Sequence, residues 1–379
     1  MEQNTGTSTD VQKWIALLGR RDSPVDGVED YCSFLGEALS RRGVELKQVR
    51  VNWSDLGWLG ALRELRRESA SWGGNWVLLQ FTALGWSQRG FPFGVLFVLR
   101  ILRRKGARVA VMFHEPARQV AKPTFINRIR GACQDWVIKG LYNGAERAIF
   151  ADPLATISWL QADRTKATFI PIGGNIPEPP AGEKSAAVPA PGATTKTVAV
   201  FCLSDLPNRR DELAYISQAV KFAASNGSKI RVVFLGRGTP EAHDEIADAF
   251  AGLPAEVVNL GLLPAGEVSS TLAASDVMLC VRGPLFPRRG SAIAGIACGV
   301  PIIAYSGNSL GPELLEAGID FVPYRDAKAL DDALALLLAD DERRQSLRDR
   351  SLRAQRKYFS WDVIAGNFCD FLKPQSSQS

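Results

Sequence analysis

A short stretch rich in glycine and proline concentrates positive charge between two apolar runs. It carries, in chain order, three arginines, a glycine and a serine: Arg282, Arg288, Arg289, Gly290 and Ser291. The preceding run, residues 277–281, is too short for a helix and predicts a buried strand, and residues 292–298 predict a short helix that Ser291 caps. Because the amides at a helix start and guanidinium groups both bind anions, we expect a phosphate site in this loop. The alternative is a strand–loop–helix unit whose arginines are solvated surface residues.

Two further arginines, Arg209 and Arg210, follow a predicted strand at residues 197–202. A guanidinium group can bind two phosphate oxygens at once, so one of this pair is expected to contact the same phosphate. The alternative is an ion pair with Asp205 or Asp211. The sequence alone leaves both interpretations open.

His114 and Glu115 follow another predicted strand, residues 107–113. An imidazole at a strand end can contact a sugar or a developing charge, and a neighbouring carboxylate can orient the ring or act as a base. We therefore treat both residues as candidate catalytic groups. The alternative is a strand-end histidine that is bonded to the backbone.

These residues need a scaffold that places several strand ends together, and the pattern of the chain predicts one. Two series of short apolar runs alternate with helical segments: 13–19, 44–46, 75–81, 107–113, 145–151 and 168–175, then 197–202, 230–235, 256–260, 277–281 and 301–305. Such alternation indicates an α/β protein with parallel sheets. Two Rossmann-like domains would bind a ligand in a cleft at the carboxyl ends of their strands. The expected domains are 1–176, a Pro/Ala/Gly-rich linker at 177–196, a second Rossmann-like domain at 197–358, and a closing helix and tail at 359–379.

Length and composition agree with a two-domain globular protein. The chain has 379 residues, of which 46% are hydrophobic and 22% charged, and its net charge of +5 is too small to indicate nucleic-acid binding. The six cysteines form no CxxC pair, which favours free thiols, and two histidines make a histidine-based metal site unfavourable. The polar N-terminus resembles no signal peptide, and no apolar run reaches about 20 residues. We expect a cytoplasmic protein; the alternative is a peripheral position at the inner membrane face.

One segment, residues 91–105, is apolar and ends in a basic cluster. It could rest on a membrane, which would suit a lipid-linked acceptor. The alternative is a core helix whose basic end complements the helix dipole. A group of tryptophans suits sugar stacking or a membrane interface, although part of it is expected in the core: Trp53, Trp58, Trp72, Trp76 and Trp86.

The chain resembles a known family. The module GSAIAGIACGVPIIA at 290–304, the closing Phe-Ser-Trp at 359–361 and the early DGVEDYCSFLGEALSRRG at 26–43 are similar to GT-B glycosyltransferases, most closely the retaining family-four group. The resemblance implies a GT-B fold whose last helix crosses back to the first domain. It places domain 1–176 on the acceptor side and makes domain 197–358 the nucleotide-sugar-binding domain. It also implies transfer of a sugar from a nucleotide-sugar to a glycan or lipid-linked acceptor, in polysaccharide or glycoconjugate biosynthesis. No cofactor is expected, because the nucleotide-sugar is a substrate, and no metal ion is needed if the arginines and the helix dipole neutralise the diphosphate.

The resemblance also gives roles to individual residues. The amides of Gly290 and Ser291 would bind the donor diphosphate, and His114 would lie near the donor sugar. Asp26 and Gly27 form an anion-binding turn by residue type, and the resemblance places them in the acceptor-side loop. The remaining donor contacts fall on residues that follow strands of the second series: Arg209 or Arg210, Gly236, and Arg288 or Arg289.

The sequence departs from the family at two positions. The family carries two glutamates that contact the ribose and the sugar of the donor, and alignment on the Ala-Cys-Gly at 297–299 places Phe286 and Ala294 there. Losing one such hydrogen bond costs roughly 0.5–1.5 kcal/mol. The alternative function is therefore a non-catalytic GT-B protein that partners or regulates an active enzyme. A sugar-nucleotide epimerase, which would need no acceptor, is a third hypothesis.

Overall fold

The computed structural model describes residues 11–22, 26–116, 124–160, 164–179, 194–206, 208–308 and 310–373. The chain divides into two compact units. Unit 1 comprises residues 1–171 and 361–379, and unit 2 comprises residues 172–360. Each unit is built on one parallel six-stranded sheet.

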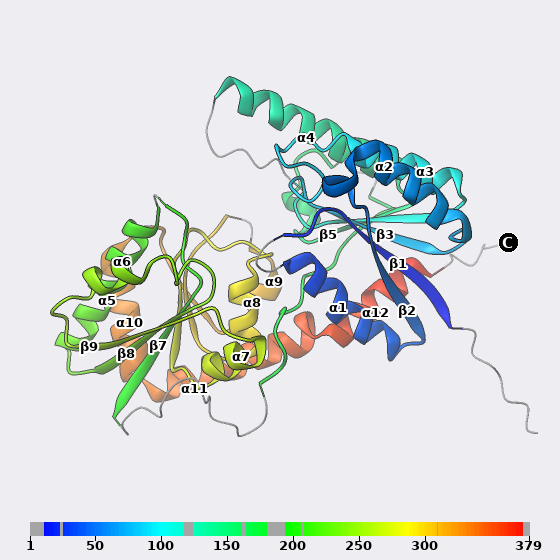
Figure 1. Ribbon diagram of the computed structural model, residues 1–379. Helices are drawn as coiled ribbons and strands as arrows, with labels where there is room; N and C mark the ends of the chain where they lie inside the picture. The colour runs from blue at the N-terminus through cyan, green and yellow to red at the C-terminus, as the bar shows by residue number, and fades with distance from the viewer. Residues whose placement is uncertain are drawn as a thin grey trace, which may run out of the picture. The chain divides into compact units, whose positions relative to one another are not determined.

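Unit 1 has the strand order β2-β1-β3-β4-β5-β6. Its strands are β1 (Gln12–Leu18), β2 (Val44–Arg50), β3 (Trp76–Phe81), β4 (Arg108–Phe113), β5 (Arg147–Phe150) and β6 (Ala167–Phe169). Its helices are α1 (Gly27–Ser40), α2 (Trp53–Glu68), α3 (Gly94–Arg104), α4 (Phe125–Gly144) and α12 (Trp361–Leu372), with short turns η1 (Ser69–Ser71) and η2 (Leu154–Thr156). The order reverses after β2, so right-handed crossovers place α1 on one face and α2, α3 and α4 on the other, as Figure 1 shows.

Unit 2 repeats this plan with the order β12-β11-β10-β7-β8-β9. Its strands are β7 (Thr195–Phe201), β8 (Lys229–Leu235), β9 (Ala255–Gly261), β10 (Val277–Cys280), β11 (Ile302–Tyr305) and β12 (Ile319–Val322). Its helices are α5 (Asn208–Ser225), α6 (His243–Ala249), α7 (Ala265–Ala273), α8 (Gly290–Ala297), α9 (Pro312–Leu315), α10 (Ala327–Ala339) and α11 (Asp341–Ala354), and η3 (Gln355–Phe359) follows α11. The strand order switches direction between β7 and β10, where doubly wound sheets bind ligands.

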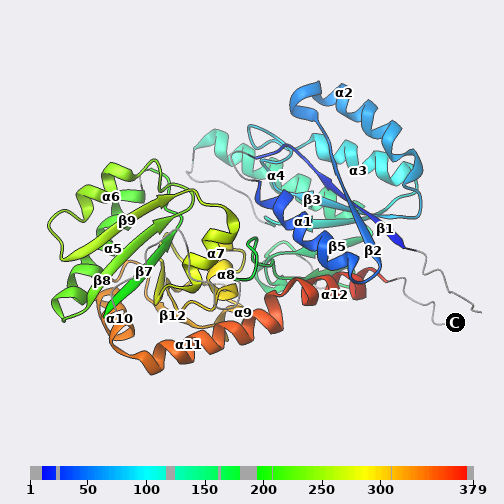
Figure 2. The same cartoon turned by 60° about the horizontal axis from the view of Figure 1, so that its bottom comes forward.

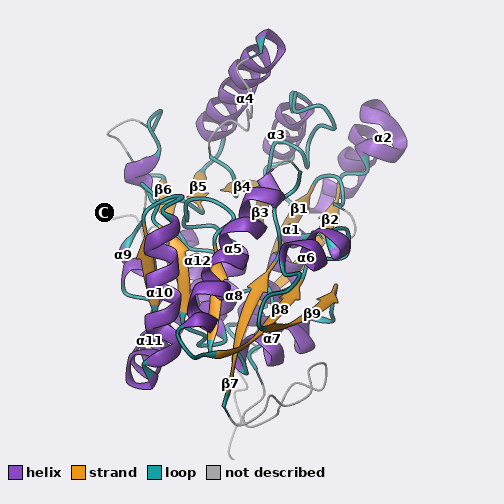
Figure 3. Ribbon diagram, turned by 90° about the vertical axis from the view of Figure 1, so that its left-hand side faces the viewer, coloured by secondary structure: helices purple, strands orange, loops and turns teal. Residues whose placement is uncertain are grey.

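Both sheets are covered on their two faces, which explains the continuous apolar runs in the sequence. All six residues of β3 and all four residues of β10 are buried. In unit 2, α5 and α10 pack on one face of the sheet and α7 and α8 on the other, as Figures 2 and 3 show. The α/β class with two Rossmann-like sheets is confirmed.

The boundaries between the units differ from the expected ones. Ile172 and Ile176 pack against the core of unit 2, so the chain joins that unit before residue 177. The predicted linker 177–196 is also too long at its other end, because Thr195 already begins β7, and residues 180–193 of it lie outside the described ranges. The closing helix begins at Trp361 and belongs to unit 1, which confirms the expected crossing.

The tryptophan group named from the sequence is largely core. Trp53, Trp72, Trp76 and Trp86 are between 1% and 8% exposed, and Trp58 stacks on Trp53 with 5.4 Å between ring centroids. The apolar face of α3 is buried too, so the core interpretation of residues 91–105 holds for that face. No helix in the described part of the chain is long and apolar enough to cross a membrane.

Candidate functional site

The loop with the three arginines connects β10 to α8 at the carboxyl edge of the unit 2 sheet. We call residues 282–289 the arginine loop. The helix begins at Gly290, and Arg289 is its N-cap residue without a side-chain cap bond. The predicted capping role of Ser291 is therefore wrong: the Arg289 carbonyl accepts the first helical bonds, from Ala292 and Ile293 at 3.0 and 3.1 Å. Gly290 and Ser291 are the first two helical residues, whose amides have no acceptor within the helix and can bind an anion.

A single aromatic ring holds two of the arginines. The guanidinium carbon of Arg289 lies 4.2 Å from the centroid of the Phe286 ring, and that of Arg288 lies 4.9 Å from it. Arg289 also donates from a terminal nitrogen to the Pro284 carbonyl at 3.4 Å. Phe286 is one of the two positions where the resemblance places a glutamate. Where the family has a carboxylate, this chain therefore has an aromatic ring that makes cation–π contacts with two arginines.

The third arginine, Arg282, belongs to the same electrostatic cluster. Burial lowers the pKa of the Arg289 guanidinium, and the nearby positive charges of Arg282 and Arg288 lower it further, while Cys280 and Glu212 oppose the shift. Positive charge is therefore crowded at this edge of the sheet. A bound polyanion would relieve that repulsion, so the arrangement supports the predicted phosphate site.

Glu212 is a site residue that sequence reasoning missed. It lies in α5, is 5% exposed, and its carboxylate accepts the Ser204 amide at 2.8 Å. Burial raises its pKa, against the opposing influence of the Ser204 bonds and of Arg282 and Arg289. A glutamate in the first turns of a polar helix gives no local sign of burial, so only the tertiary structure reveals it.

This pKa shift gives a prediction about pH-dependent stability. Because the pKa of the folded-state carboxyl is raised, the folded protein binds more protons than the unfolded chain between the ordinary glutamate pKa and the raised value, and stability falls as pH rises through that window. We expect Glu212→Gln to have a smaller loss of melting temperature between pH 5 and pH 7 than the wild type. Glu241→Gln, at an exposed position, is the matched control and should keep the wild-type pH profile. Identical profiles for wild type and Glu212→Gln would contradict the prediction.

Arg209 and Arg210 lie in the first turn of α5, and their surroundings differ. Arg209 is 7% exposed, donates to the Ser204 carbonyl at 3.1 Å and forms an ion pair with Glu245 at 3.4 Å. The alternative prediction of an ion pair with Asp205 or Asp211 is therefore wrong for Arg209, whose partner is Glu245. Arg209 holds the loop that carries Ser204, whereas Arg210 is exposed and remains a candidate for phosphate contact.

Gly236 follows β8 directly, and both its backbone conformation and its close neighbours require a glycine there. Its φ is +91°, and a Cβ at this position would lie 2.8 Å from the Phe201 ring and 2.9 Å from the Cys202 Sγ. Any side chain would displace the end of β7. Gly236 therefore keeps the carboxyl edge of the sheet closely packed beside the arginine loop.

In unit 1, His114 lies directly after β4 at the carboxyl edge of the sheet. Its Nε2 is 2.8 Å from Oε1 of Gln80, while the Gln80 amide nitrogen donates to the Leu78 carbonyl at 3.3 Å. This amide orientation fits His114 Nε2 as the donor of the bond. The Tyr31 ring packs edge-on against His114 with 5.1 Å between centroids. Gln80 was missed in the sequence, although a glutamine inside an otherwise apolar strand was a usable signal.

The predicted anion-binding turn at Asp26 and Gly27 does not have the required open amides. The Asp26 carboxylate caps α1 by accepting the amides of Val28 and Glu29 at 3.1 and 3.2 Å. It also pairs with Arg50 at 3.4 Å. Since the side chain of Asp26 already occupies the helix start, an anion has no place there. The acceptor-side role of Asp26 and Gly27 stays a prediction.

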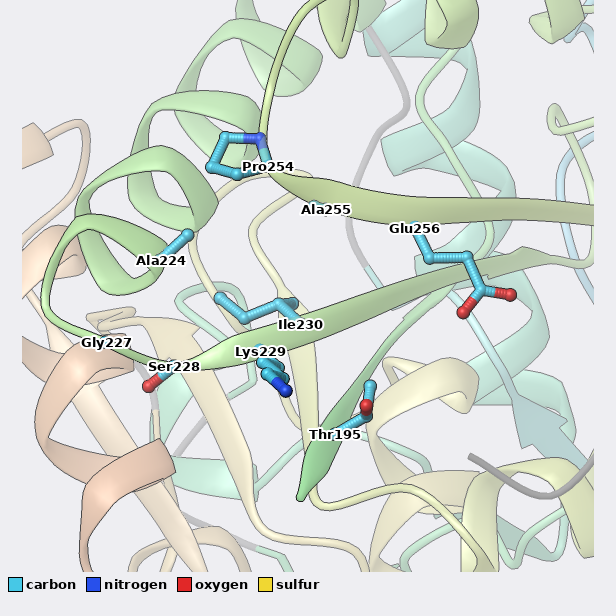
Figure 4. Close-up of a pocket in the computed structure, with 9 residues that line it drawn as sticks. All are labelled: Thr195, Ala224, Gly227, Ser228, Lys229, Ile230, Pro254, Ala255 and Glu256. Atoms are coloured by element: carbon cyan, nitrogen blue, oxygen red, sulfur yellow. The ribbon is translucent and has the colours of Figure 1, made fainter. Parts of the chain in front are cut away.

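A surface hollow in unit 2 lies at the amino ends of β7, β8 and β9, as Figure 4 shows. Thr195, Lys229 and Ala255, the first residues of these strands, line it. This is the sheet edge opposite to the arginine loop, so the hollow is separate from the candidate site. In the ranges that the structure describes, no group of His, Cys, Asp and Glu side chains is arranged to hold a metal ion.

Comparison with known proteins agrees with this arrangement. Residues 197–340 match the sequence model of the family described as Glycosyl transferases group 1. These residues lie in unit 2 and include β10, the arginine loop and α8. No curated protein sequence matches the chain.

Several solved structures share the fold over nearly the whole chain. Sucrose-phosphate synthase from Thermosynechococcus elongatus is 17% identical, with a TM-score of 0.66 over 95% of this chain and 98% of its own. A glycosyltransferase from Rickettsia africae is 10% identical, with a TM-score of 0.66 over 96% and 99% of the two chains. Anabaena HepE in complex with UDP is 10% identical, with a TM-score of 0.62 over 95% and 99%.

The two parallel sheets give the chain the GT-B fold of these solved structures, and residues 197–340 of unit 2 match the group 1 glycosyl transferase model.

Proposed function

We propose that this protein transfers a sugar from a nucleotide-sugar to a glycan or lipid-linked acceptor, in polysaccharide or glycoconjugate biosynthesis in the cytoplasm. The observation that carries the proposal is the crowding of Arg282, Arg288 and Arg289 beside the start of α8, at the switch point of the unit 2 sheet. A diphosphate fits this site because it offers several oxygens to guanidinium groups and backbone amides. HepE, which shares the fold, has been solved in complex with UDP-glucose.

The site residues act on the leaving group. As the glycosidic bond of the donor breaks, negative charge grows on the departing diphosphate. The arginines and the amides of Gly290 and Ser291 stabilise that charge with fixed positive groups. These groups do this work without a metal ion. Gly236 keeps the neighbouring strand ends in place.

His114 and Glu115 are proposed to act at the sugar. The His114 imidazole could contact the donor sugar or a developing charge, and the bond between its Nε2 and Gln80 fixes the orientation of the ring. Glu115 follows it directly and could orient the ring or act as a base. Asp26 and Gly27 are proposed to lie on the acceptor side.

Thermal-shift measurement with a panel of nucleoside diphosphates and nucleotide-sugars tests the donor proposal. A ligand that binds only the folded protein stabilises it by about 2.7 kcal/mol at a hundredfold excess over its Kd. We expect one base to raise the melting temperature clearly and the others to do so less. A panel without any stabilising member would refute the donor proposal.

Phe286 and Ala294 favour a second candidate, a non-catalytic GT-B protein that partners or regulates an active enzyme. Ala294 is 2% exposed within the core of unit 2, so no polar group takes the place of the second glutamate. Incubation with the nucleotide-sugar identified by binding separates the candidates. Release of nucleoside diphosphate, with or without an acceptor, supports the enzyme, and binding without any turnover supports the regulator. Turnover of the donor sugar without release of the diphosphate would indicate an epimerase.

A further inference from the structure

The outer helices of unit 1 have an unusual surface. Helices α2, α3 and α4 lie side by side on one face of the sheet, as Figures 1 and 3 show. Their inner sides pack on the core, as expected for an α/β layer. Their solvent sides also carry large exposed apolar side chains. We call this solvent side the outer helix face.

Helix α4 carries the clearest apolar stripe. Phe125, Ile129 and Trp136 are 79%, 40% and 60% exposed. Spacings of four and seven residues place them on one side of the helix. On the opposite side, Val137 and Leu141 are buried against the rest of unit 1. A helix that is apolar on both sides buries one side within its own unit, and its second apolar side stays exposed unless another molecule binds there.

Helices α3 and α2 extend the same surface. Phe97 of α3 is 59% exposed, and Leu59 of α2 is 79% exposed. Phe93, which is 40% exposed, packs against Trp136 of α4 with 5.9 Å between ring centroids. The exposed apolar groups of α3 and α4 therefore meet in one patch, and Leu59 adds apolar surface on the neighbouring helix α2. Monomers seldom expose a patch of this kind without a function.

Trp136 differs from every other tryptophan of the chain. All nine tryptophans lie in the described ranges, and Trp136 alone among them is exposed. An indole ring combines a large apolar surface with a polar N–H group, which suits the boundary between water and lipid. The exposure of Trp136, in contact with Phe93, points to such a boundary.

Positive charge accompanies the patch. The three helices and Lys105 contain ten basic and four acidic side chains, an excess of six charges, whereas the whole chain has a net charge of +5. The rest of the chain is therefore nearly neutral. Within the described residues, six exposed arginines of this layer form no salt bridge: Arg63, Arg66, Arg67, Arg100, Arg103 and Arg104.

The order along the helices is also regular. In α3, Phe93 and Phe97 are followed on the same side by Arg100 and Arg104. In α2, Leu59 is followed by the arginines of its last turns. The apolar groups thus lie toward the helix starts, and helix starts adjoin the carboxyl ends of the strands. This is the edge of the sheet where β4 ends at His114.

We propose that the outer helix face binds the surface of an anionic phospholipid bilayer. Apolar side chains enter the boundary between headgroups and acyl chains, and the arginines bind the negative headgroups. A second copy of the chain fits less well, because a symmetric contact would bring two strongly positive faces together. Membrane binding itself does not depend on the proposed function. Its consequence rests on that function: the carboxyl edge of the first sheet would meet a lipid-linked acceptor at the membrane surface.

Vesicle flotation with the full-length protein tests the proposal. We expect the wild type to float with vesicles of phosphatidylcholine and phosphatidylglycerol, at least about tenfold more than with phosphatidylcholine alone, and to be released as salt rises. No flotation with anionic vesicles at low salt would overturn the proposal. A dimer in analytical ultracentrifugation that the variants below dissociate, without vesicle binding, would assign the face to a second copy instead.

Surface variants locate the contact. Phe125→Ser, Ile129→Ser and Trp136→Ser combined should reduce flotation at least about tenfold, and Arg100→Gln, Arg103→Gln and Arg104→Gln combined should do the same for anionic vesicles. The matched controls in unit 2 are Phe222→Ser with Leu336→Ser and Lys221→Gln with Arg353→Gln, all at exposed positions, and they should float like the wild type. Equal flotation of the surface variants and the wild type would overturn the proposal.

Fluorescence quenching and nucleotide binding are two further measurements that test the membrane contact. Brominated lipids should quench tryptophan fluorescence in the wild type and much less in Trp136→Phe, which retains the apolar ring. Quenching that is the same in both proteins would overturn the assignment of Trp136 to the contact. Nucleotide binding should be unchanged in every surface variant, so failure of the donor proposal and failure of membrane binding are seen separately.

Discussion

Replacing Arg288 and Arg289 together with alanine is expected to lower the affinity for the proposed ligand, a nucleoside diphosphate, by about a hundredfold or more. Each hydrogen bond to a charged group is worth about 1.5–3 kcal/mol, and about 1.4 kcal/mol corresponds to a factor of ten. Both guanidinium groups lie on the Phe286 ring at the start of α8, so both are held in place before a ligand arrives. Little ordering entropy then opposes binding.

Titration calorimetry with the nucleoside diphosphate chosen from the thermal-shift panel measures this effect. Arg353→Ala, at an exposed position of α11, is the matched control and should bind like the wild type. Arg288→Lys with Arg289→Lys should give an intermediate affinity, because lysine keeps the charge but loses the planar fork and much of the contact with the ring. If the double alanine variant keeps wild-type affinity, the diphosphate does not bind at the arginine loop.

The architecture of both units follows from features that are local in the sequence. Strands buried on two faces need continuous apolar runs, and residues 277–281 therefore predicted β10 (Val277–Cys280) almost to the residue. The same argument gave residues 107–113 for β4 (Arg108–Phe113). Alternation of such runs with helical segments then allowed only parallel sheets with covering helices.

The parts of the candidate site that could be predicted are charged or polar residues that directly follow a strand, because strand ends can be located from the sequence. The arginine loop and His114 both follow that rule. Contacts decided by distant parts of the chain were not predictable. Arg209 pairs with Glu245, which is 36 residues away, and His114 bonds to Gln80, which is 34 residues away. Ser291 has the residue type of a cap, but the backbone of Arg289 begins the helix earlier.

The last helix has the largest expected effect on stability. Phe368→Ala is expected to lower the free energy of unfolding of unit 1 by about 3–5 kcal/mol, the usual cost of removing a fully buried phenylalanine side chain. Phe368 is 0% exposed, and its helix, α12, is held at both ends. The Trp361 ring packs on Tyr31 and Phe34 of α1, and the Leu372 carbonyl accepts the indole N–H of Trp76 at 2.9 Å.

Tryptophan fluorescence during urea unfolding isolates this effect, because all nine tryptophans belong to unit 1. The midpoint of the fluorescence transition should fall strongly in Phe368→Ala. Phe222→Ala, which removes a ring that is 40% exposed in unit 2, should leave this midpoint unchanged. A wild-type midpoint in Phe368→Ala would mean that α12 contributes little to unit 1. With the expected result, residues 1–171 alone would lack part of their own core, because a helix nearly 200 residues further along the chain completes it.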